Sequence, residues 1–406
     1  MSLGLYISVP FCRTKCSYCN FASDVFSRAM FQRYLDRLCA DMAHASETAE
    51  TLGGHFERSV NSVYMGGGTP TILDVTQLQR LLVTIPQHFE LSADAEITVE
   101  CAPGTLTPPK VEALAGCGMN RVSLGVQSFV DQEARAVGRL HTRAVVLEDI
   151  ARLRANGITN INIDLIAGLP HQTAESWEVS LSEVIATGAP HVSVYMLEID
   201  EDSRLGRELI AGGTKYHAHF APDEDLTADL YETACARLAA AGIAQYEISN
   251  FAREGFESRH NLKYWTRQPY YGFGADAHSM LRGDGYGLSR GAPQSVRFAT
   301  ADSFEAFLAG ASLQPSPISQ QSALEEAFFL GLRLARGVDL KQVAAEFGDD
   351  AIETFSATMA DLADSGLLLR DGDSIRLTAR GRLLSNEVFE RFIAEPARMT
   401  AEETGV

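Results

Sequence analysis

Residues 10–21 read Pro-Phe-Cys-Arg-Thr-Lys-Cys-Ser-Tyr-Cys-Asn-Phe, which places Cys12, Cys16 and Cys19 in a C-x3-C-x2-C pattern. Three thiolates this close together can bind three irons of a cubane [4Fe–4S] cluster and leave the fourth iron without a protein ligand. A structural zinc site normally has four ligands, and no fourth cysteine or histidine lies nearby in the sequence. We therefore predict a cluster whose open iron can bind a small chelating molecule. The alternative is three unrelated cysteines in a loop.

The composition indicates a soluble globular protein. The chain has 406 residues, of which 46% are hydrophobic and 21% are charged, and this length has room for two domains. We find no apolar stretch of about 18 residues and no basic segment at the start of the chain, so we expect neither a transmembrane helix nor a signal peptide. The seven cysteines, three of them in one triplet, favour a reducing, cytoplasmic location and metal chemistry over disulfides.

The net charge of −19 limits the partners that this chain can have. Binding to nucleic acid requires a basic surface, so we predict no nucleic-acid partner. Purely electrostatic attachment to anionic lipid is disfavoured for the same reason. Peripheral association through a membrane protein remains open.

Short β-rich segments alternate with helical patterns through the first half of the chain. The predicted strands span Leu3–Val9, Ser62–Met65, Glu96–Glu100, Arg121–Val126, Ile161–Ile166 and Val192–Met196. The predicted helices span Phe31–His44, Val75–Ile85, Pro109–Ala115, Ala144–Asn156 and Ala174–Thr187. Asp74 is the predicted N-cap of the second helix, and Gly157 is the predicted C-cap of the fourth. Such units in series predict a parallel sheet with helices outside it.

Residues with unusual chemistry fall at the carboxyl ends of the predicted strands. They are Cys12, Gly66–Thr69, Glu100, Gln127, Asp164 and Tyr195. In a barrel these ends meet at one face, whereas a flat sheet brings together only those at its switch point. We therefore predict an α/β fold with a partial (βα)6 TIM-like barrel.

The strand–helix rhythm weakens after about residue 200. We predict a helix over residues 223–241, a strand over 246–249, an ordered loop region over 253–291 and a linker over 313–318. A helical module follows, with a hairpin around Asp371–Asp373 and a last helix over 379–393, which resembles a winged helix. The predicted domains are residues 1–312 and 313–406. Because the second is rich in acidic residues, we expect it to pack or to dock a partner rather than to bind DNA.

The stretch Gly66-Gly67-Gly68-Thr69-Pro70 follows a predicted strand directly. Glycines at such a place let the backbone approach a ligand closely, although a simple tight turn has the same composition. The lysine and serine or threonine of a phosphate-binding P-loop are missing, so a nucleoside triphosphate is disfavoured. Beside a cysteine triplet, a ligand site is the better interpretation.

Taken together, these stretches resemble the radical S-adenosylmethionine (SAM) superfamily and, within it, the HemN/HemW group. The similar stretches are Tyr6–Cys12, Gly66–Thr71, Arg121–Phe129, Asn162–Pro170, Tyr246–Ala252 and His260–Trp265. The resemblance implies that SAM chelates the open iron of the cluster. It also implies reductive cleavage of SAM to methionine and a 5′-deoxyadenosyl radical, a reaction that the cofactors supply.

The resemblance assigns roles by position. Cys12, Cys16 and Cys19 match the cluster ligands. The positions that match SAM contacts are Tyr6, Tyr18, Gly67, Gly68, Thr69, Glu100, Gln127, Arg139 and Asp164. A carboxylate can accept hydrogen bonds from an ammonium or a ribose, and an arginine can pair with a carboxylate. Alternatively, the two acidic residues cap strands or form ion pairs, and Arg139 is a solvated helix residue.

The position of Phe21 bears on the function within this group. HemN-type enzymes, the oxygen-independent coproporphyrinogen III dehydrogenases, carry a further cysteine at that position and an extension before the first strand. The chain is more similar to the haem chaperones, which deliver haem to haem-accepting respiratory proteins. The expected function is therefore a cluster- and SAM-binding haem chaperone, with catalytic activity left open. The alternative is a radical SAM enzyme acting on a tetrapyrrole. A homodimer is also left open.

His260 is the candidate haem ligand. In the stretch His260-Asn261-x-x-Tyr264-Trp265, a neutral imidazole can ligate haem iron, and the two aromatic side chains offer flat apolar faces. The alternative is a buried histidine that is hydrogen-bonded within a loop. His278 and His217 are weaker candidates for the same role.

Overall fold

A computed structural model describes residues 2–283 and 295–393 of the chain. The chain divides into two compact units. The first comprises Met1–Tyr264, Gln268–Asp284 and Ser295–Pro317, and the second comprises Trp265–Arg267 and the chain from Ile318 onward. No helix in the described ranges is both long enough and apolar enough to cross a lipid bilayer.

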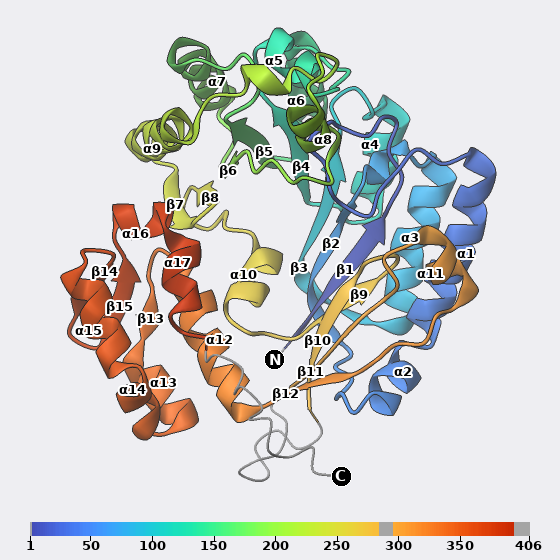
Figure 1. The fold of residues 1–406 in the computed structure, drawn as a ribbon. Coiled ribbons are helices and arrows are strands. Elements are labelled where there is room, and N and C mark those ends of the chain that lie inside the picture. Colours follow the sequence, from blue (N-terminus) through green and yellow to red (C-terminus); the bar gives the residue numbers. More distant parts are fainter. Residues whose placement is uncertain (1, 284–294, 394–406) are drawn as a thin grey trace. The chain divides into compact units, whose positions relative to one another are not determined.

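Six parallel strands form the centre of the first unit (Figure 1). They are β1 (Leu3–Val9), β2 (Ser59–Gly67), β3 (Glu90–Cys101), β4 (Arg121–Gln127), β5 (Asn160–Ala167) and β6 (His191–Met196). Each strand pairs with the next one along the chain, so the sheet has no switch point. Because right-handed crossovers in one direction place every helix on the same face, this order confirms the prediction of a partial barrel.

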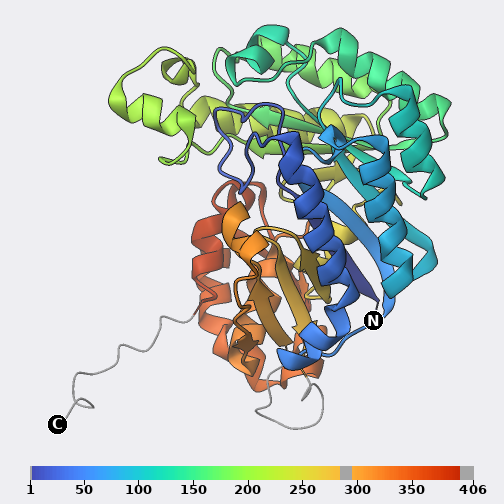
Figure 2. The same ribbon diagram turned by 90° about the vertical axis from the view of Figure 1, so that its right-hand side faces the viewer.

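Helices connect these strands and lie on the outer face of the sheet (Figures 1 and 2). They are α1 (Arg28–Ala43), α2 (Ala45–Thr51), α3 (Val75–His88), α4 (Pro108–Gly116), α5 (Asp131–Ala136), α6 (Arg143–Ala155) and α7 (Ala174–Thr187). In β1, the side chains of Leu5, Ile7 and Val9 are fully buried at alternate positions. The opposite face of that strand carries Tyr6 and Ser8. The sheet thus buries an apolar face and keeps polar side chains on the other.

Further strands extend the sheet at both edges. The order of the twelve strands is β12-β11-β10-β9-β1-β2-β3-β4-β5-β6-β8-β7. The added strands are β7 (Ala244–Glu247), β8 (Asn250–Ala252), β9 (Tyr270–Phe273), β10 (His278–Arg282), β11 (Ser295–Ala299) and β12 (Ser316–Ile318). The remaining helices of this region are α8 (Arg204–Ala211), α9 (Glu224–Ala240), α10 (Arg259–Trp265) and α11 (Phe304–Ala309).

The region predicted as an ordered loop therefore has regular structure. Residues 253–283 contain α10, β9 and β10, so the loop prediction was wrong for them, and residues 284–291 lie outside the described ranges. The predicted linker over 313–318 is partly strand β12.

Local sequence signals behave as expected at the helix ends. Asp74 caps α3 in a capping box: its Oδ1 accepts from the Gln77 backbone N–H at 2.9 Å, and Gln77 Oε1 accepts from the Asp74 N–H at 3.0 Å. Gly157 follows the end of α6 with φ +80°. Asp223 caps α9 by accepting from the Leu226 N–H. The prediction of Asp74 as an N-cap is confirmed because a cap depends on contacts within a few residues, whereas the C-cap of α6 is Asn156, one residue before the predicted Gly157.

The second unit contains short helices and a small antiparallel sheet. Its helices are α12 (Gln320–Leu332), α13 (Leu340–Phe347), α14 (Asp350–Thr354), α15 (Ser356–Asp364), α16 (Ala379–Leu383) and α17 (Ser385–Glu390). The sheet has the order β13-β15-β14, with β13 (Val338–Asp339), β14 (Leu368–Asp371) and β15 (Ser374–Leu377). The predicted hairpin is confirmed. The prediction of a single last helix over residues 379–393 was wrong, because the backbone at Leu384 (φ −102°, ψ 31°) separates α16 from α17.

Candidate functional site

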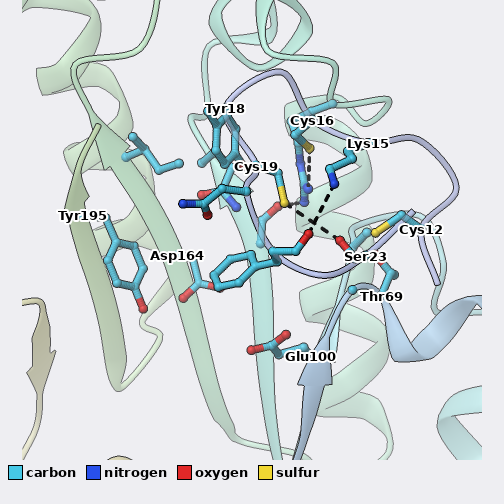
Figure 3. Close-up of a pocket in the computed structure, with 18 of the residues that line it drawn as sticks. Cys12, Lys15, Cys16, Tyr18, Cys19, Ser23, Thr69, Glu100, Asp164 and Tyr195 are labelled. Carbon is cyan, nitrogen blue, oxygen red and sulfur yellow. Dashed lines mark hydrogen bonds between the residues drawn. The ribbon is translucent and has the colours of Figure 1, made fainter. Parts of the chain in front are cut away.

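The carboxyl ends of the six central strands surround a cavity of about 560 Å³ (Figure 3). Most of the residues predicted to bind the cluster or SAM line this cavity. They are Cys12, Cys16, Tyr18, Cys19, Gly67, Gly68, Thr69, Glu100, Gln127, Arg139 and Asp164. Figure 3 shows the cysteines on one loop, facing Glu100 and Asp164 on the strands. These residues are far apart in the sequence, and the barrel brings them to one face.

The loop that carries the cysteines is held by backbone hydrogen bonds. Gly68 N donates to Val9 O at 2.9 Å, and Thr69 N donates to Phe11 O at 2.8 Å, so the loop continues the pairing of β1 with β2. Farther along, Cys12 N donates to Asp24 O at 2.9 Å. These contacts fix the backbone of an irregular segment, so the thiols are positioned before any ligand binds.

The glycine stretch provides a close backbone approach. Gly67 has φ +99°, a conformation that side chains disfavour. At Gly68, an added Cβ would lie 2.8 Å from the carbonyl oxygen of Phe11 and 2.9 Å from that of Val9. Both contacts are with backbone atoms, which cannot move aside cheaply. Gly68 therefore needs to be glycine, because the cysteine loop packs directly against it.

Two carboxylates lie on neighbouring parts of the cavity wall. Glu100 accepts from the Tyr64 hydroxyl at 2.8 Å and from the Gly67 N–H at 3.2 Å. Desolvation raises the pKa of Glu100 to about 7, and the charge of Asp164 adds to this effect. Asp164 accepts from Ser123 Oγ at 3.0 Å, and desolvation raises its pKa as well. Such a pair favours a ligand that offers a cation or several hydroxyl groups.

A basic and an amide side chain complete the wall. Arg139 donates to the backbone oxygen of Gly125, and its Nη1 lies 3.5 Å from Cys16 Sγ. Gln127 has a left-handed backbone with φ +69°. Its Oε1 is buried and accepts no hydrogen bond within the described part of the chain. A buried acceptor without a donor is costly, so this oxygen is ready to accept from a ligand.

Tyr6 and His260 lie away from the main cavity. Tyr6 lines a second cavity of about 290 Å³, which shares Phe21 and Gly67 with the first. His260 lies on α10 and is fully buried. Its Nδ1 lies 3.2 Å from Ser62 Oγ, and its Nε2 lies 2.9 Å from the Tyr264 hydroxyl. Both ring nitrogens therefore have hydrogen-bond partners, which favours the structural alternative, and the haem-ligand role of His260 stays a prediction.

Three residues that support the two carboxylates were not predicted from the sequence. Tyr64 donates to Glu100, and Ser123 donates to Asp164. Asn162 Nδ2 donates to the other oxygen of Asp164 at 2.7 Å. All three lie on β2, β4 or β5, on the same side of the sheet as the carboxylates. The period of two along each strand was the signal that could have found them.

The three cysteines do not form a site for a single ion. In the described ranges, no three side chains of histidine, cysteine, aspartate or glutamate are grouped as they would be around one metal ion. A cubane cluster does not need such a group, because each cysteine binds a different iron.

Comparisons with known proteins agree with this geometry. Residues 6–184 match the radical SAM superfamily, and residues 318–384 match the HemN C-terminal domain. The chain is 34% identical over 394 residues to the protein named heme chaperone HemW of Bacillus subtilis, covering 96% of this chain and 99% of the relative. It is 30% identical over 402 residues to the HemW of Escherichia coli, covering 97% and 98%. The structure of coproporphyrinogen III oxidase (HemN) from Escherichia coli, described as a radical SAM enzyme, is similar with a TM-score of 0.80 and 25% identity, covering 96% of this chain and 90% of that one.

The superfamily implies a [4Fe–4S] cluster and SAM, and the cavity fits both. Thiolates are the ordinary ligands of such a cluster. The unpaired Gln127 Oε1 and the two carboxylates suit the polar groups of SAM. Given this fit, the near full-length similarity and the shared fold, the chain belongs to the HemW family of radical SAM proteins.

Proposed function

We propose that this chain is a haem chaperone, which binds haem and passes it to haem-accepting proteins of respiration. The observation that supports this most directly is the near full-length similarity to proteins named heme chaperone. Phe21 adds support, because HemN-type enzymes carry a further cysteine at this position.

Within the main cavity, we propose that Cys12, Cys16 and Cys19 bind the cluster. SAM would then be held by Tyr18, Gln127, Arg139, the two carboxylates and the backbone of Gly67–Thr69, while Tyr6 lines only the second cavity. When bound, these cofactors supply one-electron cleavage of SAM. The chain contributes position and charge: Glu100 and Asp164 accept hydrogen bonds, and the loop backbone keeps the thiols in place.

The test uses protein that is reconstituted anaerobically with iron and sulfide. Haem is added, the complex is separated from free haem, and an apo-haem protein such as apomyoglobin is supplied. We expect a Soret band on this chain that moves to the acceptor over time. We also expect no conversion of coproporphyrinogen III under reducing conditions with SAM. Clean formation of protoporphyrinogen in that assay would contradict the proposal.

A second function is favoured by the similarity to the HemN structure over most of the chain. It is a radical SAM enzyme that acts on a tetrapyrrole, either by decarboxylation or by modification of haem. This function predicts that 5′-deoxyadenosine forms in amounts that depend on the added porphyrin. If SAM cleavage stays slow with every porphyrin supplied, this second function is rejected.

The proposal includes a cytoplasmic location and contact with the membrane through the acceptor protein. The net charge of −19 supports contact with a protein rather than with anionic lipid. The oligomeric state is left open between a monomer and a homodimer. Light scattering with and without haem measures it.

A further inference from the structure

The second cavity has the character of a site for a flat apolar ligand. It has a volume of about 290 Å³ and lies next to the cysteine cavity, with Phe21 and Gly67 in the walls of both. Three tyrosines line it: Tyr6, Tyr264 and Tyr270. Aromatic side chains of this kind provide large apolar faces with polar edges. Phe21, which is 65% exposed, adds a further apolar face at the rim.

His278 is the histidine that lines this cavity. It is the first residue of β10, and its side chain is 70% exposed. Within residues 2–283 and 295–393, its ring makes no hydrogen bond. The nearest charged group is Asp276, whose Oδ1 lies 3.8 Å from Nε2. The contrast with His260 is direct, because His260 is fully buried and both of its nitrogens are engaged.

The turn that carries His278 is held rigidly. Asp276 has a left-handed backbone with φ +54°, and its N–H donates to Ala301 O at 2.9 Å. Ala275 N donates to the hydroxyl of Tyr34 at 2.8 Å, and that hydroxyl donates to Ser8 O at 2.8 Å. The turn is thus fixed to β1 through Tyr34 and to the segment that follows β11. The backbone that leads into His278 is therefore held in place before a ligand arrives, which lowers the cost of binding.

The other candidate ligands in the cavity are poor ones. Desolvation raises the pKa of Tyr6 and of Tyr264 above the usual value for a phenol. Their hydroxyl groups therefore stay protonated, whereas ferric iron binds a phenolate. Asp276 is better suited to support a histidine, because ligating imidazoles usually donate their second N–H to a carboxylate.

We propose that this cavity is the haem-binding site and that His278 is the iron ligand. The inference rests on the proposed function, since it assumes that the chain carries haem. One face of the macrocycle packs against the tyrosines, its edge contacts Phe21, and Asp276 turns toward the ring of His278. No lysine or arginine lines the cavity, so the haem carboxylates point toward solvent.

The size of the cavity suits a protein that must release its cargo. Its volume of about 290 Å³ lies just below the usual range of ligand pockets, which is roughly 300–1,000 Å³. Haem bound here is enclosed only in part and held by one side-chain ligand. An acceptor that encloses haem fully and supplies its own ligand can then remove it.

The experiment compares haem binding by the full chain and its variants, after anaerobic reconstitution. Haem is titrated, the Soret band gives the dissociation constant, and electron paramagnetic resonance reports the axial ligand. We expect His278→Ala to weaken binding at least tenfold and to remove the signature of histidine ligation. His278→Cys keeps a ligand, so it should bind with a shifted Soret band. His44→Ala, at an exposed position beside α1, is the matched control and should leave the spectrum unchanged.

The outcomes separate the two proposals. If the unaltered chain binds haem and His278→Ala leaves both the spectrum and the affinity unchanged, the assignment of His278 is overturned while the chaperone function stands. If the unaltered chain binds no haem, the chaperone function fails and this inference fails with it. Circular dichroism of each variant checks that the fold is retained.

Discussion

At the scale of single residues, burial away from water shifts the pKa values of Glu100 and His260 in opposite directions. Desolvation raises the pKa of the Glu100 carboxyl to about 7 and lowers the pKa of His260 to about 3. In both cases the neutral form is favoured. Glu100 faces a cavity where a ligand can restore its charge, whereas His260 is enclosed by Ser62 and Tyr264.

We expect the affinity for SAM to depend on pH through Glu100. A carboxyl with a pKa of about 7 is mostly protonated at pH 6 and mostly ionised at pH 8. If the ionised form accepts from SAM, binding weakens about tenfold between pH 8 and pH 6. Calorimetric titration of unaltered protein and of Glu100→Gln at three pH values checks this, because titration of SAM itself is common to both. Parallel pH profiles would contradict the assignment of Glu100 to the SAM site.

His260 should make the fold sensitive to acid. The unfolded chain takes up a proton at this residue near pH 6.5, but the folded chain does so only near pH 3. The free energy of unfolding therefore falls as the pH drops below about 6.5. Between pH 7.5 and pH 5.0, this residue should lower the free energy of unfolding by about 2 kcal/mol. Urea unfolding of unaltered protein and of His260→Asn at both pH values measures this contribution. If the free energy of unfolding falls equally in the two proteins, the ring of His260 is protonated in the folded chain.

At the scale of elements, the sequence predicted the six central strands and most of the helices between them, but not the short helices α2 and α5. It failed where pairing partners are distant. The stretch from Tyr270 to Phe273 looked like a loop because it is rich in glycine and tyrosine, yet it pairs with Gly4–Ile7 at the edge of the sheet. Strand formation at Tyr270–Phe273 depends on pairing with β1 and not on the β-propensity of these residues. The tyrosine that supports Glu100 was missed for a similar reason, because side-chain partners across strands are set by the register of the sheet.

The glycine stretch after β2 gives a test at this scale. Gly68→Ala would place a Cβ 2.8 Å from the Phe11 carbonyl oxygen, so the cysteine loop must move. We expect stability to fall by about 1–3 kcal/mol and SAM binding to weaken at least tenfold. Gly116→Ala is the matched control, because an added Cβ there meets no atom within 4 Å. Similar behaviour of the two variants in thermal unfolding and SAM titration would refute a close approach at Gly68.

At the scale of the whole molecule, chain order determines which residues meet. Because β1 to β6 follow one another around the sheet, residues from Cys12 to Tyr195 gather at one face, and this gathering was predictable. The second cavity was not, since it depends on β9 and β10. The domain boundary placed after residue 312 stays a prediction, as do the roles of the individual site residues.

The net charge of −19 leads to an expectation about membranes. We expect no sedimentation of the protein with vesicles of anionic lipid at low salt, because like charges repel. Vesicles that contain a haem-accepting membrane protein should bind this chain and carry it into the pellet. Binding to protein-free anionic vesicles that disappears on addition of salt would instead indicate a basic patch that attaches to lipid.

Tyr34 connects the two cavities through one oxygen atom. Its hydroxyl bonds both the strand that leads into the cysteine loop and the turn that leads into His278. A ligand that displaces either backbone therefore changes the energy of the other. Thermodynamic linkage makes such coupling symmetric: the factor by which SAM changes the dissociation constant of haem equals the factor by which haem changes that of SAM. For haem bound in the second cavity as proposed, occupancy of the radical SAM site would in this way change how readily the haem leaves.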